Sequence, residues 1–319
     1  MAHTDAVGNS VNLPDYAGAL FVIGAQAGKT PLLSMTGSMT QGGIVTGATF
    51  VMGNFLTLDA ASEGDVVSET SSITAPASDI FAPAQQTNYI QIMLKRFDLS
   101  YKAQAQGTLS GVAAVDMGTT KPATSSFQRD AFLLQMACNM EWSMLRGTGT
   151  EPATAATAGT TRGIITAVNA DGSTEIDASN AALSKSLMEQ LEVAILGQTN
   201  GMEMPVIFAG AYVVQRLHDL YGNPDTSMEI GGVSLQQLAL PTLNRCGLTY
   251  SPYVPTSTLA LVDVAKVRPV FMRKPGKPSA FFEELAKTGA ADSEQFFTMF
   301  GVDYANADYH GTIINIATS

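Results

Sequence analysis

Short apolar runs separated by glycine and small polar residues fill the segment between residues 30 and 94. The runs at 44–45, 48–52 and 55–58 contain mainly strand-forming residues, and the glycines between them are typical of turns. Such a segment lacks bulky side chains, and an isolated hairpin is only marginally stable in water. The pattern therefore predicts an extended ribbon that needs a partner surface, either within this chain or on another one.

One long strand is predicted over residues 88–100, at the end of this segment. Ile90, Ile92 and Leu94 alternate with other residues, as in a strand that buries one face. The alternation fades beyond Leu94, so the pattern specifies the first half of the strand better than the second.

The clearest helix is predicted over residues 124–146. Pro122 and the cluster at 124–126 are start signals, and Gly147 is a stop signal. Apolar residues recur between them at steps of three and four: Phe127, Ala131, Leu134, Cys138, Trp142 and Leu145. At the helical rise, about twenty residues make a rod roughly 30 Å long. We expect this helix to be a central spine that is covered on nearly every side.

The second half of the chain mixes helices and strands without regular alternation. Residues 148–161 are low in complexity and predict a loop. The further predicted elements are a helix from about 183 to 195, a strand at 205–209, a helix at about 211–221, a strand at 259–264, and strand patterns near 295–304 and 310–317. This order favours an α+β fold over a doubly wound sheet.

Charge is scarce and unevenly distributed along the chain. Charged residues make up 14% of it, below the usual level of about 25%, so much of the surface must be neutral or covered by other subunits. The net charge of −11 argues against a protein that grips nucleic acid through lysine and arginine, although an acidic wall can enclose DNA without binding it. Residues 30–94 contain no lysine or arginine but five acids: Asp59, Glu63, Asp65, Glu69 and Asp79.

The cysteines and the apolar runs indicate the compartment. Cys138 and Cys246 have no CxxC spacing and are expected to be buried small hydrophobic residues under reducing conditions. The first residues lack a basic stretch followed by an apolar one, and no apolar run approaches the roughly 20 residues that span a bilayer. We therefore expect a soluble protein made in the cytoplasm, with no membrane partner.

One motif resembles a nucleotide-binding P-loop. Residues 20–30, LFVIGAQAGKT, place Gly-Lys-Thr after an apolar strand, and residues 259–263 are similar to the strand that holds Mg²⁺ in such proteins. The spacing fails, because Ile23 stands where the first glycine is needed and Pro31 delays the helix. A P-loop-like nucleotide hydrolase remains the alternative from a different functional class.

No other constellation predicts catalysis or metal binding. His3, His218 and His310 are isolated in the sequence, without HExxH or paired Cys/His spacing, and Gly-x-Ser-x-Gly does not occur. His218 and the pair at 283–284 are expected to face solvent. The sequence predicts no catalytic residue, no cofactor and no metal ligand.

Several stretches, in order, resemble the major capsid proteins of tailed phages in the SU10-like group, which have the Hong Kong 97-type capsid fold. Residues 30–37, TPLLSMTG, are similar to the TPFLSMIG stretch of that family, and residues 63–65 to its acidic Glu-Gly pair. Residues 88–92, NYIQI, are similar to its NYTQI strand. Residues 285–289, LAKTG, and 309–311, YHG, are similar to its C-terminal segment.

The resemblance implies an order of domains. It assigns residues 1–35 to an N-terminal arm, 36–94 to an extended β loop, 95–180 to a peripheral domain with the spine helix at about 124–146, 181–270 to an axial domain, and 271–319 to return strands of the peripheral domain.

The resemblance also implies a structural role and no enzymatic one. The expected function is self-assembly into the icosahedral shell that encloses the DNA genome of a tailed bacteriophage, in the capsid of a virion built in the host cytoplasm. The implied partners are copies of the chain in hexamers and pentamers, possible decoration, scaffold and portal proteins, and double-stranded DNA enclosed without sequence-specific binding. A protein-packaging nanocompartment shell of the same fold is a second alternative.

In such shells the extended loop lies over a neighbouring subunit, which would supply the partner that the ribbon needs. The candidate intersubunit contacts are Phe50, Phe55, Leu58, Glu63 and Asp65. Some shells of this fold join neighbours covalently through a lysine on this loop. Because residues 30–94 contain no lysine, we expect a non-covalent overlap, with a decoration protein as a possible addition.

Overall fold

The computed structural model describes residues 29–37, 43–56, 68–74, 80–81, 83–102, 125–199, 201–222, 227–243, 245–287 and 289–318. The helices are α1 (Pro31–Met35), α3 (Ser125–Arg146), α4 (Ile164–Asp171), α5 (Lys185–Gln198) and α6 (Ala211–Tyr221), with 3-10 turns η3 (Ser71–Ile73), η4 (Val264–Lys266) and η5 (Ala307–Tyr309). The strands are β1 (Gly43–Val45), β2 (Thr49–Phe55), β3 (Ala84–Tyr89), β4 (Gln91–Ser100), β5 (Thr148–Thr150), β6 (Thr160–Arg162), β7 (Glu175–Asp177), β8 (Pro205–Ala209), β9 (Ser227–Ile230), β10 (Val233–Leu238), β11 (Cys246–Tyr250), β12 (Leu259–Asp263), β13 (Arg268–Met272), β14 (Ala280–Glu284), β15 (Ala291–Asp303) and β16 (Gly311–Ile314).

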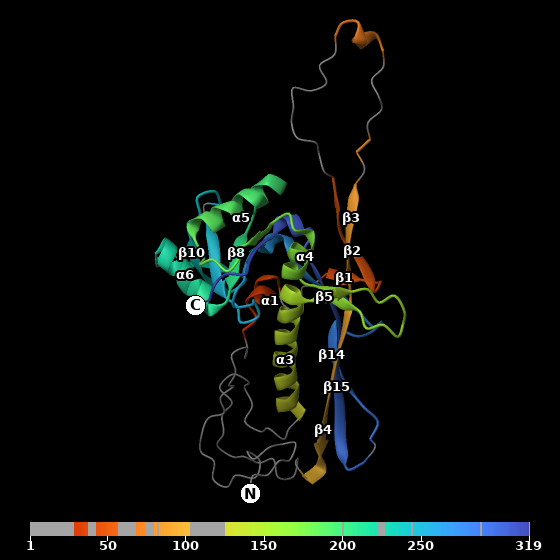
Figure 1. Cartoon of the computed structure of the whole chain (residues 1–319). Coiled ribbons are helices and arrows are strands. Elements are labelled where there is room, and N and C mark those ends of the chain that lie inside the picture. The colour runs from red at the N-terminus through yellow and green to blue at the C-terminus, as the bar shows by residue number, and fades with distance from the viewer. Residues whose placement is uncertain are drawn as a thin grey trace.

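A five-stranded sheet supports the long helix α3 (Figure 1). Its central strand β15 pairs antiparallel with β4 on one side and with β14 and β13 on the other, and β1 joins β13 in parallel. The helix packs on this sheet through a stacked ring pair, Phe97 and Phe132, whose centroids lie 5.3 Å apart. Arg129 adds a bidentate pair with Glu294, at 2.6 and 2.9 Å, so helix and sheet are joined by apolar and ionic contacts.

A seven-stranded sheet forms the other part of the body, in the order β7-β16-β12-β8-β11-β10-β9. Every residue of its central strands β8 and β12 is buried. Alternation sends Ile207 and Leu261 into the core under α5 and α6, while Val206 and Val262 face the core that includes α3 and α4. A sheet covered on both faces explains why these strands read as continuous apolar runs.

Strands β2 and β3 form a two-stranded antiparallel ribbon that projects away from the body, with η3 at its far end (Figure 1). The register shifts between Val51 and Gly53, which places a bulge in the ribbon. The ribbon enters the body at Ile90, and β4 continues from there into the five-stranded sheet.

Most elements predicted from the sequence are confirmed. The spine helix is α3, residues 125–146, and the helix predicted at 211–221 is α6. The single strand predicted over 88–100 is interrupted at Ile90, where the ribbon ends and the sheet begins. Both cysteines are buried and free, as expected, and the mixture of helices and sheets confirms an α+β fold.

Three details differ from the sequence predictions. The predicted loop at 148–161 contains β5 and the start of β6, which form a hairpin, and α4 follows it with Gly172 at φ 71° as its left-handed cap. Strand β16 lies in the seven-stranded sheet between β7 and β12, whereas the resemblance assigns residues 271–319 to return strands of the domain that holds the spine helix. Strand β13 begins at Arg268, inside the predicted axial segment, but pairs in the five-stranded sheet. Strand patterns do not specify which of two sheets a strand joins.

Candidate assembly surface

The short helix α1 is held by a buried carboxylate on the spine helix. Glu141 of α3 is fully buried, and its Oε1 and Oε2 accept hydrogen bonds from the backbone N–H groups of Leu32, at 2.9 Å, and Leu33, at 2.7 Å. Burial raises the pKa of Glu141 to about 7, although the two hydrogen bonds oppose that rise. Two backbone N–H groups at the start of the helix that follows Lys29 and Thr30 therefore have their hydrogen-bond acceptors within the protein.

This contact removes the support for a nucleotide site. The helix N–H groups of Leu32 and Leu33 are bound to Glu141 and so are not free to bind a phosphate, and the Lys29 ammonium lies 4.8 Å from the centroid of the Tyr250 ring. Asp263, at the end of the strand that resembles a Mg²⁺-holding one, accepts the N–H groups of Glu203 and Met204 at 3.0 and 2.9 Å. The remainder of the motif, residues 20–28, lies outside the described residues.

The two histidines of the described chain, His218 and His310, are hydrogen-bonded to neighbouring groups of the protein. His310 is fully buried between Tyr304, whose carbonyl lies 2.9 Å from Nε2, and Asp263, whose N–H donates to Nδ1 at 3.2 Å. Burial lowers the pKa of His310 to about 4, so the ring is neutral near pH 7, with Nε2 as the donor to the carbonyl. His218 lies on α6 and contacts Gln236 at 2.5 Å, and His3 is outside the described part.

The residues that the structure describes contain neither a cluster of metal-ligating side chains nor a helix that could span a membrane. Within those residues, no group of three or more His, Cys, Asp or Glu side chains is arranged to hold a metal ion. In the same part of the chain, no helix has the length and apolar character to cross a bilayer.

Asn88 fixes the base of the ribbon to the body. Its fully buried side chain donates from Nδ2 to the carbonyls of Arg162, at 3.0 Å, and Val302, at 2.8 Å, and its Oδ1 accepts the Arg162 N–H at 2.8 Å. Val302 donates in turn to the Thr161 hydroxyl at 3.1 Å. One amide thus joins β3, β6 and β15, which sets the direction in which the ribbon leaves the body.

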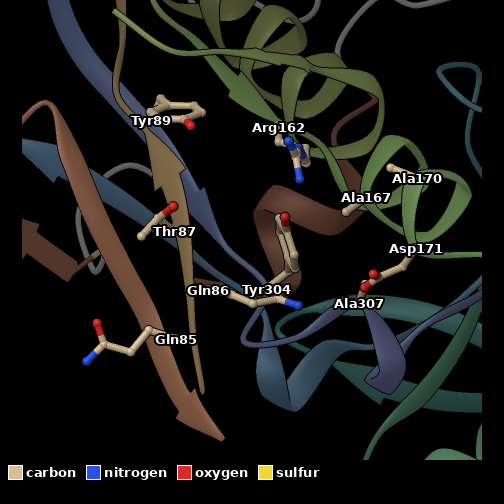
Figure 2. A pocket seen from close by; sticks show the side chains of 10 residues that line it. All are labelled: Gln85, Gln86, Thr87, Tyr89, Arg162, Ala167, Ala170, Asp171, Tyr304 and Ala307. Atoms are coloured by element: carbon tan, nitrogen blue, oxygen red, sulfur yellow. The ribbon is translucent and has the colours of Figure 1, made fainter. Parts of the chain in front are cut away.

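A polar pocket of about 270 Å³ lies beside this base (Figure 2). Arg162, Asp171 and the buried Tyr304 lie around it, and the side chains of β3 supply the opposite wall. Burial raises the pKa of Tyr304 to about 12, so its hydroxyl stays protonated beside Arg162. The pocket lining holds one cation, Arg162, and one carboxylate, Asp171, and among the lining residues the structure shows no nucleophile held by a neighbouring base.

The ribbon, taken as β2, β3 and the described residues between them, carries large apolar side chains that its own chain leaves exposed. Ile73 and Ile80 are 84% and 83% exposed. The full set among the described residues is Val51, Leu56, Ile73, Ile80 and Phe81. Burying such side chains stabilises an association, so this set makes the ribbon a candidate contact surface.

A second apolar surface lies beside α3. A groove of about 300 Å³ runs between β4 and the helix, with Ile92 and Trp142 at its sides. These side chains are 64% and 40% exposed. The apolar stripe predicted for α3 is therefore not covered at Trp142 within one copy, and the neighbouring Glu141, a charged residue, is buried instead.

Comparison with known proteins gives the family. The family model of the SU10 major capsid protein matches residues 3–317. The chain belongs to this family. It is a major capsid protein, and the family implies self-assembly into a capsid shell, a place in the capsid of the virion and a non-enzymatic role.

Solved structures show that this SU10-family protein has the Hong Kong 97-type fold. The cyanophage A-1(L) capsid protein matches at 11% identity and a TM-score of 0.64, covering 93% of this chain and 95% of the other. A chain of the solved structure of Microbacterium phage Oxtober96 matches at 12% identity and a TM-score of 0.57, covering 92% of this chain and 93% of the other. The SrpI encapsulin of Synechococcus elongatus matches at 10% identity and 0.55, covering 88% and 86%. No curated protein matches the sequence significantly.

The contact residues predicted for this SU10-family protein divide into two groups. Phe50 is only 7% exposed and packs on Gly301, where an added Cβ would lie 2.9 Å from its ring. Its ring is already covered by its own chain, which argues against the predicted role as an intersubunit contact. Period-two alternation places Val51 on the opposite face from Phe50, but it does not tell which of the two faces is buried. The side chains of Phe55, Leu58, Glu63 and Asp65 lie outside the description, and their contacts stay predictions.

Proposed function

We propose that this major capsid protein builds an icosahedral shell of hexamers and pentamers around the double-stranded DNA of a tailed phage. The ribbon of each copy lies over a neighbouring copy and holds the shell without covalent links. The observation that carries the proposal is the projecting β2–β3 ribbon, together with the exposed side chains on the chain between its two strands, Ile73, Ile80 and Phe81. Such a contact joins two different surfaces of neighbouring copies. When it is repeated around a rotation axis it gives a closed ring, and hexamers and pentamers are rings of this kind.

The charge of the chain supports enclosure of DNA without sequence-specific binding. A net charge of −11 gives an electrostatic repulsion from phosphates, so packed DNA can stay free to move and to leave. We expect purified subunits to show no measurable retention of linear double-stranded DNA at physiological salt. Scaffold, portal and decoration proteins would complete the assembly.

The test of this function is electron microscopy of the expressed full chain. Closed, uniform, rounded shells are the expected result. A protein that stays monomeric at all concentrations and salt conditions would contradict the proposal.

A nanocompartment shell is the second candidate, because the encapsulin SrpI shares the fold. The contents of particles from the native source distinguish the two functions. Nuclease-protected double-stranded DNA supports the phage shell, and a bound protein cargo without DNA supports the nanocompartment.

A further inference from the structure

The polar pocket between the base of the ribbon and α4 holds two charged side chains, Arg162 and Asp171. In the part of the chain that the structure describes, neither of them belongs to an ion pair. Arg129 and Arg268, by contrast, each hold a carboxylate, at 2.6 and 2.8 Å. A half-buried arginine without a carboxylate, in a concave polar site, is available to a ligand.

Hydrogen-bond donors surround the space beside Arg162. Figure 2 shows its guanidinium and the hydroxyl of Tyr304 directed toward each other. Tyr304 is 1% exposed, and burial raises its pKa to about 12, so the hydroxyl is protonated near pH 7 and can donate to an acceptor. The hydroxyl of Thr87 and the amide of Gln86 line the pocket from β3. An oxyanion in this space therefore meets donors from both the body and the ribbon.

Asp171 brings a negative charge to another part of the pocket. It is the last residue of α4, so the partial negative charge of the helix C-terminus adds to that of its carboxylate. A cation or an N–H donor is favourable at this place, and a second negative charge is unfavourable. The pocket thus disfavours a multiply charged anion such as phosphate. It favours a single carboxylate with a donor group at the other end of the same molecule.

The size of the pocket and the shape of the guanidinium agree with such a ligand. The volume of about 270 Å³ is well above the roughly 30 Å³ that one water molecule occupies in the liquid. A guanidinium offers two parallel N–H groups, which match the two oxygens of a carboxylate.

We propose that this pocket binds a monocarboxylate that carries an ammonium or N–H group, with the carboxylate at Arg162 and Tyr304 and the donor at Asp171. The bound ligand touches β3 on one side and the body on the other, so it adds to the 2.7 Å hydrogen bond between Gln86 and Asn306 and braces the base of the ribbon. The carboxylate comes either from a free amino acid or from an acidic side chain of a second copy, whose backbone supplies the N–H. Binding takes place in the single subunit and does not depend on assembly.

Titration of unassembled full-length subunits with simple amino acids tests the site. Glycine, 4-aminobutyrate and 6-aminohexanoate carry the same two charges at increasing separation. At constant ionic strength, at least one of them should shift the amide resonances of α4 and β3 in a saturable way. It should bind about tenfold tighter than acetate, phosphate or methylammonium, the effect of a second charge-assisted hydrogen bond. Binding of all three amino acids no tighter than that of acetate would overturn the proposal.

Substitutions assign the two ends of the ligand. Arg162→Gln keeps the backbone groups that bind Asn88 and should weaken binding at least about tenfold. Asp171→Asn should remove the preference for the amino acid over acetate. The matched control is Arg245→Gln, an exposed arginine that does not line the pocket, which should leave binding unchanged. Circular dichroism checks that the variants are folded. Equal binding by Arg162→Gln and Arg245→Gln would overturn the proposal.

Hydrogen exchange tests the bracing of the ribbon. At a ligand concentration of ten times Kd, the amides of β3 should exchange up to about tenfold more slowly, because opening of the ribbon base must first release the ligand. The amides of α5 are the internal control and should keep their rates. Saturable binding with unchanged exchange in β3 would contradict the bracing.

Assembled particles distinguish the two sources of the carboxylate. If the ligand is a free amino acid, particles should bind it as tightly as subunits do, and Arg162→Gln should assemble like the parent. If a second copy supplies the side chain, particles should no longer bind the added amino acid, and Arg162→Gln should raise the subunit concentration required for assembly. Particles that bind no amino acid, together with normal assembly of Arg162→Gln, would overturn the proposal.

Discussion

The carboxylate of Glu141 accepts the backbone N–H of Leu33 at 2.7 Å, deep in the core and more than a hundred residues away in the sequence. This contact joins the first described helix to the C-terminal third of the spine helix. It fixes the point at which the chain enters the body before it runs out into the ribbon.

Removal of this carboxylate should destabilise the subunit. Glu141→Ala leaves the N–H groups of Leu32 and Leu33 buried without acceptors, so the free energy of unfolding should fall by about 2–4 kcal/mol. Urea unfolding of unassembled subunits measures the change. Glu189→Ala, at an exposed position of α5, is the control and should stay within about 0.5 kcal/mol of the parent. A Glu141→Ala variant as stable as this control would contradict the structural role.

The pKa of Glu141 predicts a pH dependence. Burial raises this pKa from its usual 4.5 to about 7, so between these values the folded chain holds a proton that the unfolded chain has released. The contribution of Glu141 to the free energy of unfolding is therefore complete below about pH 4.5 and is lost as the pH rises toward 7. The advantage of the parent over Glu141→Gln should be larger at pH 5 than at pH 8, by about 1–3 kcal/mol. An advantage that is constant or grows with pH would be incompatible with this. Tyr253, whose pKa is raised mainly by burial and in part by the charge of Glu141, is common to both proteins.

His310 predicts the opposite trend. Burial lowers its pKa from 6.5 to about 4, so the unfolded chain binds the proton first as the pH falls. The stability contributed by neutral His310, which also faces the charge of Asp263, is complete above pH 6.5 and is lost toward pH 4. We expect the unfolding free energy of the parent to fall relative to that of His310→Gln over this range, by about 1–3 kcal/mol. Parallel pH profiles for the two proteins would refute a neutral buried imidazole.

Asn88 should control the stability of the ribbon base. Asn88→Ala removes three interactions with β6 and β15 and should lower the free energy of unfolding by about 2–4 kcal/mol. Hydrogen exchange of the β2–β3 amides should also become faster, because the ribbon loses its attachment. Gln85→Ala, an exposed position on the same strand, is the control. Unchanged exchange in Asn88→Ala would show that the ribbon is held elsewhere.

Much of the fold was predictable because its signals are local. The stripe from Phe127 to Leu145 predicts α3, and the apolar runs at 205–209 and 259–264 predict the central strands of the seven-stranded sheet. The assignment of β16 to that sheet depends on pairing with β7 and β12, which lie far apart in the sequence. Local periodicity carries no such information.

The assembly surface was predicted in outline but not by residue. The short apolar runs over residues 30–94, with few bulky side chains, indicated a ribbon that needs a partner. Phe50 turns inward and Val51 outward, however, because of a register that only the complete sheet specifies. Trp142 looked like a core residue in the stripe of α3, and its exposure follows from the edge position of β4. Helical periodicity could not predict the burial of Glu141. A charged residue is rarely buried unless it has a partner, and the partners of Glu141 lie far away in the sequence.

The absence of lysine from residues 30–94 predicts shells without covalent links made there. Denaturing electrophoresis of mature particles should give a single band at the subunit mass. A ladder of linked subunits, with cross-linked peptides mapped to this segment, would contradict the prediction.

The most direct test of the account is a cryo-electron microscopy map of assembled particles. We predict a closed icosahedral shell in which the β2–β3 ribbon of each copy lies on a neighbouring copy. A shell in which the ribbon contacts only its own subunit, or projects without touching a neighbour, would contradict it.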